Sequence, residues 1–189
     1  KPADGGHDGA IAAMTFDTLN NRVITGGYDR RIKVWSTDGR LLQNFEDFAT
    51  SVTGLCYCEV TRHLWACCSC GRPYVYDLHS GSNITEIVHT GVDGLRSPSM
   101  LKLWYFEGTK DVIATTANRE VIYWRYNPTA ALRVLHGHSN WVEVLAVSNP
   151  PAPEIPELFS AGMDKKVKKW ELGTKFNPDA IYCNDEYVG

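Results

Sequence analysis

Two sets of side chains in the sequence have the residue types of a nucleophilic catalyst. Each set has a hydroxyl, a His and an Asp, and the two sets are Ser160, His138 and Asp164, and Thr25, His7 and Asp29. Such a catalyst needs an exposed nucleophile and an oxyanion hole. The serine instead lies within an apolar run, away from any Gly-x-Ser-x-Gly turn. Because the set recurs in two similar segments, it indicates a structural device, and we expect no enzymatic activity.

These two segments are copies of one internal repeat. They run from Val23 to Trp35 and from Leu158 to Trp170. Both read apolar, apolar, hydroxyl, small residue, Gly, any residue, Asp, two polar residues, apolar, Lys, any residue, Trp. A Gly-His pair precedes each copy, with its histidine at His7 and His138. Repeats of this kind point to a fold built from stacked copies of one unit.

Two weaker copies lie between the strong ones. They run from Trp65 to Tyr76 and from Ile113 to Trp124, and neither has the Asp. Aligned in this way, each is one residue shorter than the strong copies at its central turn. We therefore expect the second and third units to lack the polar set or to keep only part of it, and to pack more loosely.

Short apolar stretches separated by turn residues fill each unit. In the first unit the pattern predicts strands over 10–16, 22–26, 31–36 and 40–46. Four short strands in about 45 residues are typical of one propeller blade. The repeat resembles the WD40 family over residues 6–172. The resemblance implies an all-β fold, a WD40-type β-propeller of about four blades of four-stranded antiparallel sheet. The predicted blades span 1–49, 50–90, 91–136 and 137–189, with a Pro-rich insertion at 149–157.

The resemblance also gives the recurring polar set a structural role. In that family a His, a Ser or Thr, an Asp and a Trp of one blade form a buried hydrogen-bonded chain, which we call the tetrad. Carried onto this sequence, the tetrads are His7, Thr25, Asp29 and Trp35, and His138, Ser160, Asp164 and Trp170. The donors and acceptors match, because the indole N–H only donates whereas a hydroxyl both donates and accepts. A fully paired buried chain rigidifies its blade.

Six cysteines raise the question of a metal site or a thiol enzyme. Five lie within fifteen residues, and the six are Cys56, Cys58, Cys67, Cys68, Cys70 and Cys183. Strand alternation would bring four of them together from two adjacent strands. Zinc sites, however, usually space paired cysteines by two to four residues on turns. We expect free, buried cysteines that pack in the core, with no metal and no cofactor.

Loops of a propeller carry its contacts with other molecules. In the WD40 family the residue before the tetrad Asp, and residues just after the Gly-His pair, lie on one face. The resemblance therefore indicates five partner-binding candidates, which are Tyr28, Trp141, Met163, Asp8 and Ser139. Exposed Trp is common in binding hot spots. A separate basic patch is formed by Lys165, Lys166, Lys168 and Lys169, which could instead be a solvated strand edge.

Composition limits the partners. The net charge is −3 and the isoelectric point is near 6.1, which argue against nucleic acid as the partner. No apolar run approaches the ~20 residues of a membrane-spanning helix, and the first residues lack a signal-peptide core. These features predict an intracellular, cytoplasmic protein with no membrane contact.

Four blades leave unpaired edges and apolar surface, so we expect a partial ring that is completed by further blades of the same or another chain. We predict a non-enzymatic scaffold for protein–protein interaction in a multi-subunit complex. The fourth unit, with Glu171-Leu172 after it, resembles WD-repeat regions of cilium-associated scaffold proteins, which would imply a cytoskeletal or ciliary location. The alternative is a module that recognises a charged motif, namely a phosphopeptide, an acidic tail or RNA.

Overall fold

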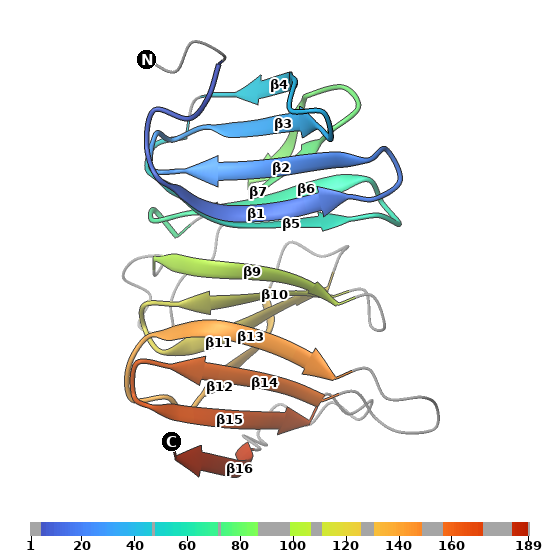
Figure 1. The fold of residues 1–189 in the computed structure, drawn as a ribbon. Coiled ribbons are helices and arrows are strands. Elements are labelled where there is room, and N and C mark those ends of the chain that lie inside the picture. The colour runs from blue at the N-terminus through green and yellow to red at the C-terminus, as the bar shows by residue number, and fades with distance from the viewer. Residues whose placement is uncertain are drawn as a thin grey trace.

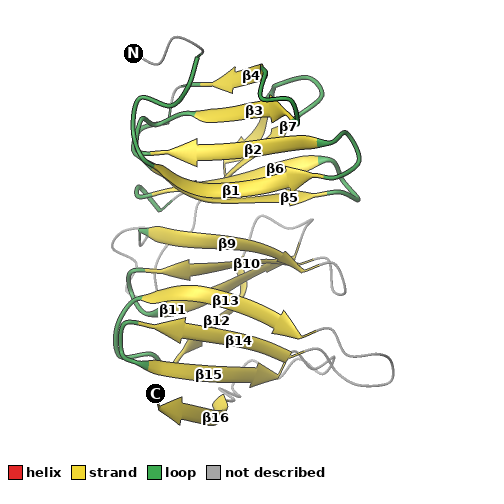
Figure 2. Cartoon of the chain, in the orientation of Figure 1, coloured by secondary structure: helices red, strands yellow, loops and turns green. Residues whose placement is uncertain are grey.

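The fold consists of strands and turns (Figure 2). The computed structural model describes residues 5–46, 48–71, 73–86, 99–106, 111–125, 131–148, 157–171 and 183–188. These residues form sixteen strands in four antiparallel sheets of four strands each. None of the described residues belongs to a helix that could cross a membrane.

Each sheet is formed by four consecutive strands that pair in chain order. Sheet one contains β1 (Ile11–Asp17), β2 (Arg22–Gly27), β3 (Ile32–Ser36) and β4 (Leu41–Phe45). Sheet two contains β5 (Val52–Cys58), β6 (His63–Cys68), β7 (Pro73–Asp77) and β8 (Asn83–Glu86). Sheet three contains β9 (Met100–Phe106), β10 (Asp111–Thr116), β11 (Glu120–Arg125) and β12 (Ala131–His136). Sheet four contains β13 (Val142–Ser148), β14 (Glu157–Gly162), β15 (Lys166–Glu171) and β16 (Cys183–Val188).

The expected all-β architecture is confirmed. The four strands predicted for the first unit agree with β1 to β4 to within one residue at each end. The period-two alternation explains this agreement, because a strand that is covered on one face alternates between the core and the other side.

The four sheets follow one another around a common centre (Figure 1). The first strands of successive sheets pack side by side, β1 against β5, β5 against β9 and β9 against β13. The buried apolar residues form three clusters, one at each junction between successive sheets. Within the described ranges there is no fourth cluster between sheet four and sheet one, so the sheets form an arc of a propeller.

The hairpin between the second and third strand has the same length in every sheet. This corrects the expectation that the second and third units are one residue shorter. The strand pairs that close the four hairpins are Val23 with Trp35, Leu64 with Tyr76, Val112 with Trp124, and Leu158 with Trp170. The same residue of each hairpin has a left-handed backbone, and these residues are Arg30, Gly71, Arg119 and Lys165. The weaker copies therefore begin one residue earlier than their apolar pattern indicated.

Some sequence features fall outside the described residues. The Pro-rich insertion is one of them, because 149–156 is not described. Most of the connection over 90–99 is another. The strand β16, which begins at Cys183, pairs with β15 at the edge of sheet four.

Candidate functional site: the turn face and its buried networks

The hairpins between the second and third strands of the sheets, together with the segments that lead into β1 and β13, define what we call the turn face. In each sheet the hairpin is joined to the segment before the first strand by one backbone hydrogen bond. The four bonds run from Tyr28 to Ala10, Ser69 to Ser51, Ala117 to Ser99, and Met163 to Trp141. Each exposed tip therefore has a defined position on the blade beneath it.

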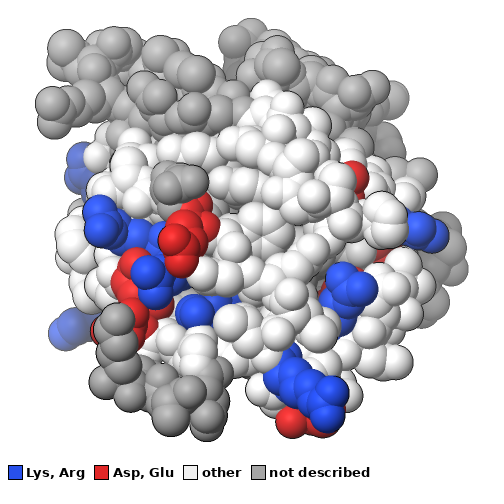
Figure 3. Space-filling view, turned by 90° about the horizontal axis from the view of Figure 1, so that it is seen from above, with Lys and Arg blue, Asp and Glu red and all other residues white. Residues whose placement is uncertain are grey.

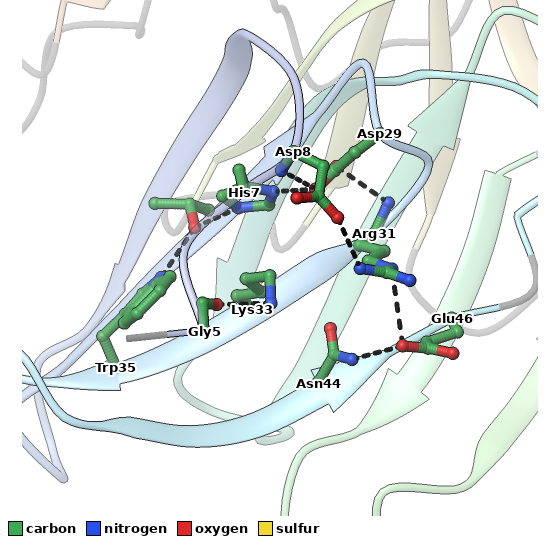
Figure 4. A network of polar contacts seen from close by, with 10 residues as sticks. Gly5, His7, Asp8, Asp29, Arg31, Lys33, Trp35, Asn44 and Glu46 are labelled. Carbon is green, nitrogen blue, oxygen red and sulfur yellow. Dashed lines mark hydrogen bonds and ion pairs between the residues drawn. The ribbon is translucent and has the colours of Figure 1, made fainter. Parts of the chain in front are cut away.

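The predicted tetrad of sheet one is brought together in one chain of hydrogen bonds (Figure 4). The indole N–H of Trp35 donates to Thr25 Oγ1 over 2.7 Å. The Thr25 hydroxyl in turn donates to His7 Nε2 at 2.8 Å, and His7 Nδ1–H donates to Asp29 Oδ2 at 2.8 Å. This direction of donation places the imidazole proton on Nδ1, and each of the four side chains then has a hydrogen-bond partner.

Sheet four contains the same chain with nearly the same geometry. Trp170 Nε1 lies 2.7 Å from Ser160 Oγ, which lies 2.8 Å from His138 Nε2. His138 Nδ1 lies 2.9 Å from Asp164 Oδ2. The side chains of His138 and Asp164 are only 1% and 2% exposed. Ser160 is also buried, and both hydrogen-bonding functions of its hydroxyl are occupied, so the arrangement offers no exposed nucleophile.

The tetrad aspartates also hold the backbone of the turn face. Asp29 accepts hydrogen bonds from the amides of Asp8 and Arg31 in addition to His7. Burial acts to raise the pKa of the Asp29 carboxyl, but these hydrogen bonds outweigh burial and hold the pKa below its ordinary value. Asp164 is arranged in the same way with the amides of Ser139 and Lys166, and its pKa is lowered for the same reasons.

One glycine in each tetrad blade makes room for this network, and the sequence analysis did not assign it this role. A Cβ on Gly27 would lie 3.3 Å from His7 Nδ1 and 3.1 Å from Asp29 Oδ1. A Cβ on Gly162 would lie only 2.5 Å from the carbonyl oxygen of Trp141. The available signal was the Gly that both strong copies share at this position.

Sheets two and three have side chains where the tetrad blades have this glycine. Strand register places Cys68 at the Gly27 position of sheet two, and Cys70 occupies the Asp29 position. Cys68 and Cys70 form a disulfide across the turn, with their Cα atoms 5.3 Å apart. This corrects the expectation that these two cysteines are free. The disulfide can form because the turn brings these two cysteines, which are two residues apart in the sequence, within bonding distance.

Sheet three uses a third arrangement. Register places Thr116 at the Gly27 position, and its hydroxyl lies 3.4 Å from Glu120 Oε2. The Glu120 amide donates to the same hydroxyl at 3.3 Å. Sheets two and three thus lack the tetrad and hold their turns by different contacts.

The five partner-binding candidates all lie on the turn face. Tyr28 is 62% exposed, Met163 is 51% exposed and Trp141 is 46% exposed. Asp8 and Ser139 are exposed as well, and their backbone amides are the ones that bind the tetrad aspartates. The buried networks therefore fix the segments that present these side chains.

The four lysines of the expected basic patch have different environments. Lys165 is exposed at the tip of the hairpin, and Lys166 is half-buried. Lys169 is half-buried and lies 3.4 Å from Glu157. Lys168 is buried. Its counterpart Lys33 is buried too and donates to the carbonyl oxygen of Gly5, so this lysine belongs to the interior of the tetrad blade.

A cavity of about 440 Å³ lies at the centre of the arc and is lined by all four first strands. Its polar side chains include Lys102 and Glu143, and Trp104 contributes an exposed aromatic ring. Lys102 Nζ reaches from sheet three to the carbonyl oxygen of Ala12 in sheet one at 3.2 Å. This contact ties together two blades that are not neighbours in the chain.

The free cysteines of the core have the environment of structural residues. Cys56 and Cys67 are buried between sheets two and three. Burial raises the pKa of Cys67 to about 12 and raises that of Cys56 well above its ordinary value. Within the described ranges no cluster of His, Cys, Asp and Glu is arranged to hold a metal ion.

These pKa values predict unreactive thiols. The thiolate is the reactive form, and a pKa near 12 leaves on the order of 10⁻⁴ of it at pH 8. We expect iodoacetamide at pH 8 to leave Cys56 and Cys67 unmodified in the native protein and to label both after unfolding in guanidinium. Peptide mass spectrometry measures the labelling. Rapid labelling of either thiol in the native protein would contradict the structure.

Four-stranded antiparallel sheets that follow one another around a centre, two of them with a His–hydroxyl–Asp–Trp chain, define a β-propeller chain. The family model described as WD domain, G-beta repeat (WD40) matches residues 4–36 and 130–171, which include the two tetrads. The first and last sheets thus match the WD40 repeat, and the four sheets together are consistent with a partial WD40 β-propeller.

Three curated relatives match parts of the chain. "WD repeat and FYVE domain-containing protein 1" of Mus musculus is 32% identical over 78 residues, which cover 39% of this chain and 18% of the relative. "Autophagy-related protein 16" of Arabidopsis thaliana is 23% identical over 173 residues, 89% of this chain and 31% of the relative. "Periodic tryptophan protein 2 homolog" of Mus musculus is 25% identical over 184 residues, 88% of this chain and 17% of the relative. The chain spans less than a third of the length of each.

Proposed function

We propose that this chain forms part of a larger WD40 propeller that acts as a non-catalytic scaffold for protein–protein interaction. WD40 repeats indicate such a scaffold in general. The observation that carries the proposal here is an apolar face of sheet one that no other sheet covers among the residues the structure describes. Cross-strand pairing places a row of side chains on this open face, namely Phe16, Val23, Trp35 and Leu41, with Met14 beside them.

The corresponding faces of the other sheets are covered by the sheet before them. In sheet four, Leu158 and Trp170 occupy the positions of Val23 and Trp35, and Trp170 is 1% exposed because sheet three packs on it. In sheet one, Trp35 is only half-buried, and Phe16 is 53% exposed. The same position in the repeat is thus core in one blade and surface in another.

The upper side of the molecule, nearest to sheet one, shows a broad uncharged area with acidic and basic side chains gathered toward its margins (Figure 3). Full burial of a large apolar side chain stabilises a fold by about 1.5–3 kcal/mol. Covering the exposed side chains Met14 and Phe16 would therefore be favourable. Exposed apolar surface of this kind marks a contact with another molecule or blade.

The outer face of sheet four differs in its residues from the face by which sheet one covers sheet two. Sheet one covers sheet two with buried aliphatic residues, among them Ile32 and Val34. Register places Val167 and Lys169 at the same positions of sheet four, and Lys169 lies 3.4 Å from Glu157. A lysine and its ion pair would have to be buried if sheet four closed directly on sheet one. This charge favours further blades between the two ends, supplied by the same or another polypeptide.

Methionine oxidation tests this proposal, because the chain has three methionines in three environments. Met14 on the open face is 58% exposed, Met163 on the turn face is 51% exposed and Met100 is buried. In the isolated 189-residue chain we expect hydrogen peroxide to oxidise Met14 and Met163 at similar rates and to spare Met100. In the intact protein purified from its source, further blades should slow the oxidation of Met14 at least fivefold relative to Met163. Equal rates for Met14 and Met163 in the intact protein would overturn the proposal.

The composition of the complex and the place of the scaffold in the cell stay predictions from the sequence. They comprise a multi-subunit assembly in the cytoplasm and a ciliary or cytoskeletal location. The turn face is the surface of this scaffold with defined partner-binding candidates.

A further inference from the structure

We infer that the turn of sheet two is a site of reversible thiol–disulfide exchange, at which a small thiol reduces the Cys68–Cys70 bond while the blade stays folded. The two sulfur atoms are bonded across the turn, and only Ser69 lies between the two residues. This chemistry goes beyond the proposed scaffold function, because it concerns a covalent bond in one turn and not the covering of sheet one.

The two cysteines differ in their access to a reagent. Cys68 is the last residue of β6 and is 0% exposed, whereas Cys70 is half-buried and follows the exposed Ser69 at the tip of the turn. The rate of attack by a thiolate depends on which sulfur it can reach. We therefore expect the incoming thiol to bond to Cys70 Sγ, with Cys68 as the leaving group.

The turn does not depend on the sulfur–sulfur bond for its place on the blade. The Cys70 amide donates to Thr50 Oγ1 at 3.1 Å. The Ser69 amide donates to the carbonyl oxygen of Ser51 at 3.2 Å. Both hydrogen bonds join the turn to the segment before β5 through groups that reduction leaves unchanged. Sheet two can therefore keep its fold in both redox states.

A disulfide across so short a loop contributes little to the stability of the fold. Disulfides stabilise chiefly by restricting the unfolded chain, and this effect grows with the number of residues that the bond encloses. The Cys68–Cys70 bond encloses a single residue. We also predict from the sequence a cytoplasmic protein, and disulfides in that compartment are usually transient, catalytic or redox-sensing. These features favour an exchangeable bond over a structural cross-link.

The free thiols of sheet two are placed where they do not compete for the pair. Cys67 directly precedes Cys68, and successive side chains of a strand point to opposite faces. Cys67 accordingly packs between sheets two and three, together with Cys56. Cys58 pairs with His63 at the opposite end of β6 from the turn. The exchange is thereby confined to the two cysteines of the turn.

A small monothiol of the glutathione class is the co-reactant that completes the step. Its thiolate bonds to Cys70 Sγ, the protein disulfide breaks, and Cys68 leaves as a thiolate that takes up a proton. A second thiolate then attacks the reagent's sulfur in this mixed disulfide, so Cys70 leaves and is protonated in turn. The protein gains two electrons and two protons, and two thiols become one glutathione disulfide. Glutathione disulfide can reverse the same steps.

The residue between the two cysteines connects their redox state to sheet three. Ser99, in the segment before β9, donates from Oγ to the carbonyl oxygen of Ser69 at 2.8 Å. The carbonyl oxygen of Ser99 accepts from the amide of Ala117, in the turn of sheet three, at 2.8 Å. Reduction removes a covalent restraint on the backbone of Ser69, so this contact between the two turns should loosen.

Peptide mass spectrometry on the intact protein tests the exchange. The native protein is equilibrated with mixtures of reduced and oxidised glutathione, quenched with acid, unfolded in guanidinium and labelled with N-ethylmaleimide. We expect Cys68 and Cys70 to become labelled together as the share of reduced glutathione rises, and to lose the label when glutathione disulfide is restored. The far-ultraviolet circular dichroism spectrum should stay the same throughout.

Two matched variants test which sulfur is attacked. With glutathione disulfide as the probe, Cys68→Ser keeps the accessible thiol but lacks its partner, so a glutathione adduct should accumulate on Cys70. Cys70→Ser keeps only the buried thiol, and its adduct should form at least about tenfold more slowly. In the wild type, the adduct trapped by acid during reduction should also map to Cys70, which provides the same test without a substitution.

Hydrogen–deuterium exchange of the intact protein measures the connection to sheet three. Reduction should speed exchange of the amides of Ser69 and Ala117 several-fold. It should leave the amide of Tyr28 unchanged, because the tetrad holds that matched turn of sheet one. Unchanged exchange at both Ser69 and Ala117 would overturn the connection.

Several outcomes would overturn the exchange site itself. They are a bond that resists about 10 mM reduced glutathione in the native protein, and a pair that stays reduced in about 10 mM glutathione disulfide. Loss of the circular dichroism spectrum on reduction would show that the bond is structural. Adducts on Cys68 in place of Cys70 would contradict the assigned direction of attack.

Discussion

Replacing Asp164 by alanine is expected to lower the free energy of unfolding by about 3 kcal/mol. The carboxylate accepts from His138 Nδ1 and from the amides of Ser139 and Lys166, so its removal leaves three donors without their acceptor. Each buried donor left unsatisfied costs about 1–3 kcal/mol, and partial access of water to the turn face brings the sum toward the lower end. Urea denaturation of the variant and the wild type measures the difference.

Two variants and a pH series distinguish the loss of this hydrogen-bond network from the general effect of removing an acidic side chain. Asp164→Asn keeps one acceptor oxygen and should cost less than the alanine. Asp38→Ala removes an exposed acid that is paired with Arg40, and should change stability by less than about 0.5 kcal/mol. The tetrad would not hold sheet four if Asp164→Ala were as mild as Asp38→Ala.

The direction of the pKa shift gives the pH dependence its sign. Asp164 has a lowered pKa in the folded protein, so its stabilising contribution is present above the pKa of the unfolded chain. That contribution disappears as the pH falls through the folded-state pKa. The wild type should therefore lose stability below about pH 4 more steeply than Asp164→Asn does. Parallel acid limbs for the two proteins would contradict this account.

The parts of the fold with regular side-chain signals could be predicted from the sequence. The strands of sheet one follow from alternation, and the two strong copies carry Gly, Asp and Trp at fixed spacing. The weaker copies could not be aligned correctly from their residue types, because Cys70 and Asn118 stand where the strong copies have Asp. The four hairpins have the same length and share one residue with a left-handed backbone. In sheet three this residue is Arg119, a residue type that does not indicate such a turn in the sequence.

The interior role of one lysine and the disulfide could not be deduced for a different reason. Lys168 belongs to a run of charged residues, which suggests a solvated edge, yet its strand position turns it toward the Gly-His segment. In sheet two the turn has Cys68 and Cys70 where the tetrad blades have Gly and Asp, and the turn brings the two sulfur atoms together. Both outcomes depend on which blade a residue belongs to, and local pattern does not carry that information.

A glycine at the junction of sheets two and three is expected to tolerate no side chain. A Cβ on Gly54 would lie 2.7 Å from Cys67 Sγ, 2.8 Å from the backbone nitrogen of Leu103 and 3.1 Å from the carbonyl carbon of Lys102. The last two atoms belong to the backbone of β9, so relief requires moving a strand instead of rotating a side chain. We expect Gly54→Ala to lower the free energy of unfolding by about 3 kcal/mol, which is at the upper end for overpacking. Urea denaturation measures this loss.

Gly39→Ala is the matched control, because Gly39 has nothing within 4 Å of the added Cβ but a φ of +87°. Backbone strain alone should cost about 1 kcal/mol there. The double variant Gly54→Ala/Cys67→Ala removes the sulfur contact but not the two backbone contacts, so it should remain strongly destabilised. Recovery of wild-type stability in the double variant would show that the sulfur, and not the approach of β9, makes the glycine necessary. The close approach also positions Lys102 for its contact with Ala12 across the centre, so loss of Gly54 should disturb the central cavity together with the junction.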